Sequence, residues 1–195
     1  MNLPDNKYQI IYADPPWKFN FRNRKGLSTD AKNNLYNTMS ADDIMSLPVN
    51  TIANDNSMLF LWVMNSEIPL ALDVMRAWGF NYITVAFTWV KTTKNTYHFG
   101  GGNWTRSNPE QCLLGKKGKI SRLSASVRNL IISPLREHSC KPDEVRDRIV
   151  QLMGDIPRIE LFARQSTPSW DSLGDDIDGM DIRESLGLLR EWFSL

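Results

Sequence analysis

The stretch Ile10-Ile11-Tyr12-Ala13-Asp14-Pro15-Pro16-Trp17 decides how this chain is organised. Its first four residues are apolar or aromatic, which is the pattern of a short buried strand. Asp14 follows at the carboxyl end of that strand, and the two prolines restrict the backbone beyond it. Trp17 offers a flat ring for stacking. A carboxylate, a rigid Pro15 carbonyl and an aromatic ring at one strand end suit an exocyclic amino group on a flat base.

The amino group of adenine is a poor nucleophile because its lone pair is conjugated with the ring. If the Asp14 carboxylate and the Pro15 carbonyl both accept its N–H bonds, the nitrogen becomes more pyramidal and its lone pair faces an electrophile. A carboxylate is too weak a base to deprotonate an aryl amine, so Asp14 would position the amine and stabilise the positive charge that builds on it. The alternative is structural, with Trp17 only filling the core.

The composition is that of a soluble globular domain with a sizeable core, with 195 residues, 42% hydrophobic and 23% charged. No apolar run approaches the roughly 20 residues of a membrane span, and residues 1–7 lack the apolar core of a signal peptide. We therefore expect a cytoplasmic protein without membrane contact. Cys112 and Cys140 lack metal-ligand spacing, and the only histidines are His98 and His138, so no metal site is expected.

Charge is distributed unevenly although the net charge is only +1. A first basic cluster follows the Asp-Pro-Pro-Trp turn and consists of Lys18, Arg22, Arg24 and Lys25. The segment Lys116–Arg136 holds six basic and no acidic residues, whereas the C-terminal part is acidic. Two basic loops that flank one site predict contacts with phosphates of a nucleic acid.

Apolar patterning predicts strands that alternate with helices. Beside the first strand, strands are expected over 57–63, 82–90, 111–115, 129–133 and 158–163. Helices are expected from a Ser40 cap to about Leu47, and over 66–78, 141–153 and 182–193, the last within the tail 180–195. This order indicates an α/β fold with a mainly parallel sheet in a single domain, 1–195. Ligands bind beyond the carboxyl ends of such strands, where Asp14 and Arg164 are expected.

Two common phosphate-binding motifs are absent from the sequence. No Gly-x-Gly-x-x-Gly turn follows a predicted strand, which disfavours a standard dinucleotide site. The run Gly100-Gly101-Gly102 precedes no predicted helix and no Lys-Ser or Lys-Thr pair, so it is not a Walker loop.

Tyr12-Ala13-Asp14-Pro15-Pro16-Trp17 resembles the signature of the permuted adenine-N6 methyltransferases. That family includes the catalytic subunit of the eukaryotic messenger-RNA adenosine methyltransferase and smaller bacterial and phage DNA enzymes. Further matches follow in the order of the family and extend the resemblance over residues 8–176. They are Leu59–Val63, Thr88–Lys91, Asn108–Gly115, His138–Glu144, Glu160–Arg164, and Trp170 with Gly174.

The resemblance implies a Rossmann-like sheet with helices on both faces and a catalytic motif that precedes the donor-binding elements. It implies S-adenosylmethionine as the methyl donor. The catalytic residues that it implies are Asp14, Pro15, Pro16 and Trp17. The implied donor contacts are Asp14, Lys141 at the methionine carboxylate, Arg164 and Thr167 near the ribose, and Asp175. At the last two positions relatives often carry asparagine; here Thr167 can still donate to a ribose, whereas Asp175 can only accept.

Two segments that flank the catalytic turn, 20–37 and 95–106, are candidate target-binding loops. The candidate substrate contacts are Trp17, Lys18, Arg22, Arg24, Trp104 and Arg106. An adenine buried in a duplex must be flipped out before its amine can react.

The leading hypothesis from sequence is methylation of adenine N6 in DNA, because the chain has the size of the bacterial and phage relatives and no added RNA-binding module. The same reaction on RNA is the first alternative, since nothing in the pocket motif reads a 2′-hydroxyl. A non-catalytic nucleic-acid-binding partner, or an enzyme for another amine such as cytosine N4, are further alternatives. The family analogy also suggests a homodimer.

Overall fold

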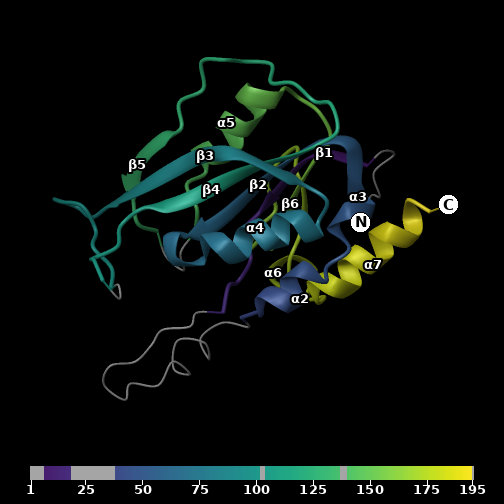
Figure 1. Cartoon of the computed structure of the whole chain (residues 1–195), viewed down its shortest axis with the longest axis horizontal. Helices are drawn as coiled ribbons and strands as arrows, with labels where there is room; N and C mark the ends of the chain where they lie inside the picture. Colours follow the sequence, from purple (N-terminus) through teal and green to yellow (C-terminus); the bar gives the residue numbers. More distant parts are fainter. Residues whose placement is uncertain (1–6, 19–37, 102–103, 137–139, 195) are drawn as a thin grey trace.

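The computed structural model of the chain describes residues 7–18, 38–101, 104–136 and 140–194. Figure 1 shows these residues as a central sheet with helices packed on it. Within these ranges no helix is both long enough and apolar enough to cross a bilayer.

One seven-stranded sheet, in the order β5-β3-β4-β2-β1-β6-β7, forms the centre of the described chain. The strands are β1 (Tyr8–Ala13), β2 (Ala53–Met64), β3 (Asn81–Thr92), β4 (Glu110–Lys117), β5 (Leu130–Pro134), β6 (Arg158–Leu161) and β7 (Asp171–Leu173). Strand β4 runs antiparallel to its neighbours β2 and β3, and the other pairings are parallel. The predicted α/β class with a mainly parallel sheet is confirmed.

Strand β1 lies between β2 and β6 and is buried on both faces. Successive side chains of a strand point to opposite faces. Ile11 and Ala13 accordingly belong to one apolar core and Ile10 and Tyr12 to the other. A continuous apolar run is the pattern that such a doubly covered strand requires.

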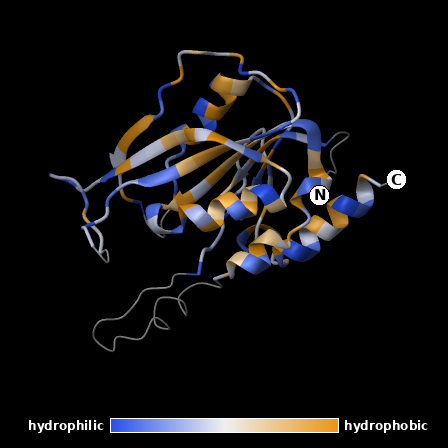
Figure 2. Cartoon of the chain, viewed as in Figure 1, coloured by the Kyte–Doolittle hydropathy of each residue, from blue (hydrophilic) through white to orange (hydrophobic). Residues whose placement is uncertain are grey.

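Helices cover both faces of the sheet, as the family resemblance implied. One face carries α2 (Ala41–Met45), α3 (Val49–Ile52), α4 (Ile68–Ala77) and α7 (Ile182–Trp192), and the other carries α5 (Glu144–Met153). Figure 1 shows α5 on one side of the sheet and α2, α4 and α7 on the opposite side. In Figure 2, α4 and α7 carry hydrophobic and hydrophilic residues side by side, as expected for helices with one buried face.

Local signals explain where two of these helices begin or end. The Ser40 hydroxyl accepts the Asp43 backbone N–H at 3.1 Å, and the Asp43 carboxylate accepts the Ser40 backbone N–H at 3.3 Å. This capping box starts α2 as predicted. The predicted helix over 66–78 begins instead with a 3-10 turn, Asn65–Glu67, before α4. Gly79, with φ of +83°, follows the end of α4.

Three elements escape prediction from the sequence: α3, α6 (Asp175–Asp178) and β7. Each is too short to show a helical or strand period. Strand β7 is extended because it pairs with β6, with Leu173 beside Leu161. The other boundaries shift by a few residues; β2 begins at Ala53 within a polar stretch, and α5 begins at Glu144.

The basic segment Lys116–Arg136 does not flank the candidate site along its whole length, which corrects the expectation of two basic loops around one site. Because β4 is antiparallel to β2, Lys117 pairs with Ser57 near the beginning of β2, whereas Glu110 lies beside its end. The lysines that end β4 therefore lie at the amino-terminal end of β2, whereas Asp14 lies at the carboxyl ends of the parallel strands. The sequence pattern of a strand contains no information about its direction.

Candidate active site

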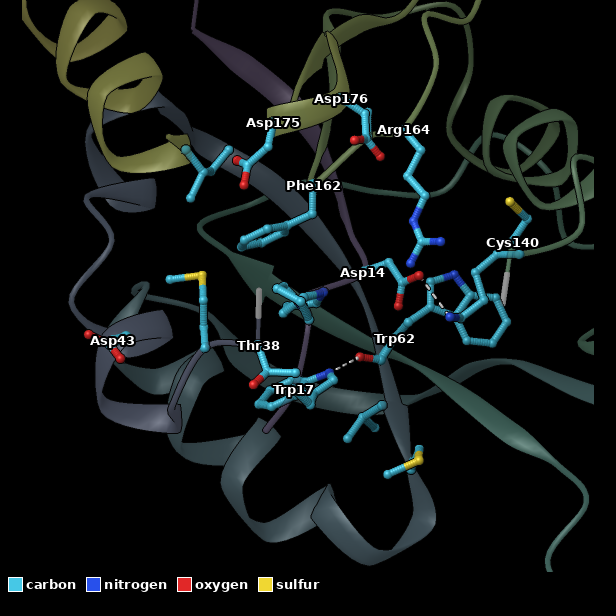
Figure 3. A pocket seen from close by; sticks show the side chains of 18 of the residues that line it. Asp14, Trp17, Thr38, Asp43, Trp62, Cys140, Phe162, Arg164, Asp175 and Asp176 are labelled. Carbon is cyan, nitrogen blue, oxygen red and sulfur yellow. Dashed lines mark hydrogen bonds and ion pairs between the residues drawn. The ribbon is translucent and has the colours of Figure 1, made fainter. Parts of the chain in front are cut away.

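A cavity of about 940 Å³ lies beyond the carboxyl ends of β1 and β6 (Figure 3). Its walls come from the turn after β1, the end of β2, the start of β4, and the loops that follow β6 and β7. This edge is where open α/β sheets bind their ligands. The cavity is large enough for a ligand of nucleotide size.

Backbone hydrogen bonds hold the turn after β1. The Pro15 carbonyl accepts the Trp17 N–H at 2.8 Å, which is the i to i+2 bond of a γ-turn. Met39 donates to the Pro16 carbonyl at 2.8 Å and accepts the Lys18 N–H at 3.0 Å. The Pro15 carbonyl therefore has a fixed direction, and its second lone pair can accept another donor.

Trp17 forms part of the cavity wall and is mostly covered. Its side chain is only 6% exposed and belongs to the core that α2 and α4 complete. Its Nε1 donates to the Trp62 carbonyl at 2.9 Å (Figure 3). The indole thus fixes the turn against β2, and the stacking of its ring on a base stays a prediction.

Asp14 lies at the cavity rim and is paired with Lys141. Its Oδ2 accepts a hydrogen bond from Lys141 Nζ at 2.7 Å (Figure 3). Lys141 is only 9% exposed, and its Nζ also lies 3.3 Å from Glu110 Oε2. From the sequence, Lys141 is expected at the methionine carboxylate of the donor, and nothing in the sequence predicts its two acidic partners. The structure shows a buried ammonium group between two carboxylates.

Glu110 extends this arrangement to Lys91, with which it forms a further ion pair. Burial raises the pKa of Glu110, but the Lys141 and Lys91 cations outweigh burial and leave that pKa below its usual value. Burial lowers the pKa of Lys141, but Asp14 and Glu110 outweigh it and leave that pKa above its usual value. Glu110 and Lys141 therefore stay charged at neutral pH, in an ion-pair chain from Asp14 to Lys91.

Two tryptophan rings lie close to the two lysine cations of the ion-pair chain. Lys141 Nζ is 5.5 Å from the Trp62 ring centre, and Lys91 Nζ is 5.2 Å from that of Trp89. The two rings meet edge to face at 6.5 Å, and Trp62 Nε1 donates to the Tyr12 hydroxyl at 2.7 Å. Aromatic faces attract cations, so the rings help to fix both ammonium groups.

A second buried ion pair fixes the helix that follows Lys141. Arg146 of α5 donates from Nε and Nη2 to the two carboxylate oxygens of Glu160, at 2.6 and 2.8 Å. Its guanidinium also lies 5.8 Å from the centre of the Tyr12 ring. Burial raises the pKa of Glu160 although Arg146 opposes it. The bidentate pair orients α5 on β6 and thereby positions Lys141.

The wall opposite Lys141 is shaped by two unusual backbone features. Phe162, directly after β6, has φ of +61°, which is rare for a bulky side chain. In Figure 3 Phe162 and Arg164 point into the cavity from this loop. A Cβ on Gly174 would lie 2.2 Å from the Ala163 carbonyl oxygen, so the loop after β7 approaches the loop after β6 only with glycine there. Strained residues of this kind are common at ligand sites.

The far end of the cavity is acidic and more exposed. Asp175 of α6 and Asp181 before α7 line it. Arg183 Nη2 lies 3.1 Å from Asp43 Oδ1, and Arg183 Nη1 lies 3.0 Å from Asp181 Oδ2, so this guanidinium joins α7 to α2. These carboxylates offer acceptors for hydroxyl groups.

Most of the predicted catalytic and donor-binding residues line this one cavity: Asp14, Pro15, Pro16, Trp17, Lys141, Arg164 and Asp175. Thr167, expected near the ribose, is not among the described residues that line it. Gln165 is the last residue of this loop that lines the cavity, and in the turn that follows, the Trp170 N–H donates to the Thr167 carbonyl at 3.1 Å. The role expected for Thr167 therefore stays a prediction.

The predicted substrate contacts are scattered. Lys18 is exposed next to the turn, and Arg22 and Arg24 lie outside the described residues, as does the rest of segment 20–37. Trp104 and Arg106 lie in the connection between β3 and β4, and neither lines the cavity.

Glu110, Lys91 and Phe162 are site residues that no sequence motif predicts individually. Glu110 and Lys91 stand inside the quoted motifs Asn108–Gly115 and Thr88–Lys91, which was the available signal. Only the antiparallel direction of β4 brings Glu110 to the edge where Asp14 lies. Within the described ranges, no cluster of three or more His, Cys, Asp or Glu side chains could hold a metal ion.

Comparison with known proteins gives matches over the same residues. The profile of the MT-A70 family matches residues 8–176. The type II methyltransferase M.MunI of a Mycoplasma species is 35% identical over 191 residues, which cover 90% of this chain and 80% of that protein. The N(6)-adenosine-methyltransferase MT-A70-like protein of Drosophila melanogaster is 31% identical over 182 residues, and human N(6)-adenosine-methyltransferase catalytic subunit METTL3 is 29% identical over 182 residues.

The match to the two eukaryotic proteins covers 90% of this chain but only 28% and 29% of their own lengths. It therefore concerns the part of each that corresponds to the sheet and cavity described above. The family profile matches most of the chain, and the Asp14-Pro15-Pro16 turn after β1 lies within that match. This chain therefore belongs to the MT-A70 family of methyltransferases.

Proposed function

We propose that this protein transfers a methyl group from S-adenosylmethionine to the N6 amino group of adenine in DNA. The observation that carries the proposal is the turn after β1, where the Asp14 carboxylate and the fixed Pro15 carbonyl lie on adjacent residues at the rim of the cavity. Two acceptors side by side match the two N–H bonds of an exocyclic amine.

The cavity fits the donor by size and by chemistry. Its volume of about 940 Å³ leaves room for a drug-sized ligand and an adenine ring. Two of the three N–H donors of Lys141 face Asp14 and Glu110, and the third can hold a carboxylate. Asp175 offers acceptors to ribose hydroxyls, Arg164 lies on the same wall, and Phe162 supplies an aromatic surface. S-adenosylmethionine, when bound, supplies an electrophilic methyl group on a sulfonium.

In this proposal Asp14 and Pro15 orient the amine so that its lone pair faces the cavity. Asp14 also stabilises the positive charge that grows on nitrogen during transfer, because its carboxylate is already in place and partly shielded from water. Lys141 and Glu110 keep Asp14 in position through the ion-pair chain. Trp17 holds the turn against β2 by its hydrogen bond to the Trp62 carbonyl.

The similarity to M.MunI, a type II methyltransferase, favours DNA as the substrate. The match covers 80% of that protein. RNA is the second candidate, because the eukaryotic relatives are named adenosine methyltransferases. We place the protein in the cytoplasm of a bacterial or phage-infected cell, where donor and DNA meet. A competition between matched deoxyribose and ribose oligonucleotides decides between the two substrates.

Mass spectrometry of nucleosides, after the protein is incubated with donor and DNA, tests the reaction directly. The wild type should form N6-methyladenine, and Asp14→Ala should reduce the rate at least about 100-fold because an aligned charge is lost from the transition state. Calorimetry should show that Asp14→Ala retains part of the donor affinity. Wild-type turnover in that variant would remove Asp14 from the mechanism, and a wild type that binds no donor would identify a non-catalytic platform.

A further inference from the structure

We infer that the connection between β3 and β4 is a pre-organised arm that stacks on unpaired bases beside the target adenine. The arm is defined by its described residues, 93–101 and 104–109. This inference rests on the proposed function, since it assigns to the arm the same nucleic acid that the cavity would methylate. It goes beyond that function because the arm would select a single-stranded or locally opened nucleic acid over an intact duplex.

The root of the arm is held by backbone and amide hydrogen bonds. The Asn108 side chain accepts the Lys91 N–H at 2.9 Å and donates to the Lys91 carbonyl at 2.8 Å, as a neighbouring strand would. His98 N–H donates to the same carbonyl at 2.9 Å, and Thr93 N–H donates to the Thr96 carbonyl at 2.7 Å. The arm therefore has a defined shape where it leaves the sheet.

Arg106 braces the outer part of the arm. Its Nε donates to the Gly100 carbonyl at 2.9 Å and its Nη2 to the Phe99 carbonyl at 3.0 Å. Gly100 N–H donates to the Ser107 carbonyl at 2.7 Å, which joins the two sides. The guanidinium predicted to contact substrate is thus engaged mainly with the arm itself, and its charge stays at the surface.

Three aromatic side chains project from this braced backbone into solvent. Tyr97, Phe99 and Trp104 are 52%, 53% and 98% exposed. Tyr97 and Phe99 are separated only by the half-buried His98. Two exposed rings so close in the chain offer aromatic faces on which neighbouring bases can stack. Exposed rings on a rigid support lose little entropy when they stack on a ligand.

The charge of the arm favours nucleic acid over a protein partner. Residues 92–109 include Lys94 and Arg106 and no acidic residue, so the rings lie in a positive environment that attracts phosphates. Aromatic rings beside cations are the usual means of binding single strands without a fixed sequence. Bases within an intact duplex have no free face, which is why the arm selects unpaired ones.

The position of the arm places its ligand next to the reaction. Its root lies between Lys91 and Glu110, which belong to the ion-pair chain that ends at Asp14. Glu110 itself lines the cavity. Figure 1 shows the connection after β3 extending outward from the sheet. A strand whose adenine enters the cavity would therefore pass its neighbouring bases along the arm.

Steady-state methylation of single-stranded oligonucleotides, with one central adenine and increasing length, tests this role. The variants are Trp104→Ala and Tyr97→Ala. Each should raise KM for the longer oligonucleotides by about 5- to 100-fold with little change in kcat, and should affect the shortest ones least. Trp104→Phe and Tyr97→Phe keep a ring and should restore most of the affinity.

Tyr82→Ala is the matched control, because Tyr82 is a similarly exposed tyrosine at 47%. It lies near the start of β3, at the other end of that strand from the arm. Its KM should stay at the wild-type value. Fluorescence anisotropy with a labelled single strand measures binding without methyl transfer, so a wild type that binds through the arm but methylates nothing sinks only the proposed function. Unchanged KM and anisotropy in both alanine variants overturns the inference. The inference is also overturned if the wild type is a dimer and the alanine variants are monomers that bind the strand as well as the wild type does, because the arm would then be a protein interface.

Discussion

The wall of the cavity around Asp14 and the wall around Asp175 are built from different kinds of contact. Around Asp14, Lys141 and Glu110 are nearly buried and the carboxylates share cations through short ion pairs. Around Asp175, the side chains lie on the short helix α6 and the start of α7, and Arg183 makes its ion pairs at the exposed end of the cavity.

The difference separates positioning from affinity. In the buried wall, low dielectric strengthens each charge interaction and makes every missing partner costly. In the exposed wall, water screens the charges and replaces lost partners. We therefore expect changes near Asp14 to affect folding and chemistry together, and changes near Asp175 to affect donor binding alone.

The largest expected effect comes from Lys141→Ala. Removing this buried cation leaves Asp14 without its ion-pair partner and leaves Glu110 with Lys91 alone, which should lower the free energy of unfolding by about 3–5 kcal/mol. Urea denaturation followed by circular dichroism measures it. Arg183→Ala removes an ion-paired cation from the exposed wall and should shift the midpoint far less; equal shifts in the two variants would abolish the distinction between the walls.

Glu110→Gln should have a smaller, pH-dependent effect. At neutral pH, loss of hydrogen bonds to charged partners should cost about 1.5–3 kcal/mol. The fold lowers the pKa of Glu110, so its ion pairs stabilise the protein above the usual glutamate value of 4.5 and are lost as pH falls through the lowered pKa. The difference in unfolding free energy between wild type and variant should thus shrink as the pH is lowered from neutrality to below that usual value. A difference that stays constant over that range would contradict the assignment.

Asp175→Asn should produce the smallest change in stability, within about 0.5 kcal/mol, since it alters an exposed side chain. If Asp175 accepts a ribose hydroxyl, losing the charge should weaken donor binding by about 2- to 12-fold. Calorimetric titration with S-adenosylmethionine measures this affinity. Unchanged affinity, alongside wild-type stability, would show that the exposed wall does not hold the donor.

Much of the fold follows from local patterns in the sequence. The apolar run before Asp14 predicts a central strand because only a doubly covered strand needs such a run. The Ser40–Asp43 capping box predicts the start of α2, since its partners are three residues apart. Short elements such as β7 are not predicted, because a few residues show no hydrophobic period. Strand β7 is extended because it pairs with β6.

By itself, the sequence determined the acidic Pro-Pro turn at the end of β1 and, through the motif order, the family. Only the tertiary structure decided that Glu110 meets Lys141 and that Trp17 is covered. The physical reason is that these outcomes depend on strand direction and on contacts between segments distant in the chain. Such contacts form when whole elements pack, and the residues concerned carry no local mark of their future partners.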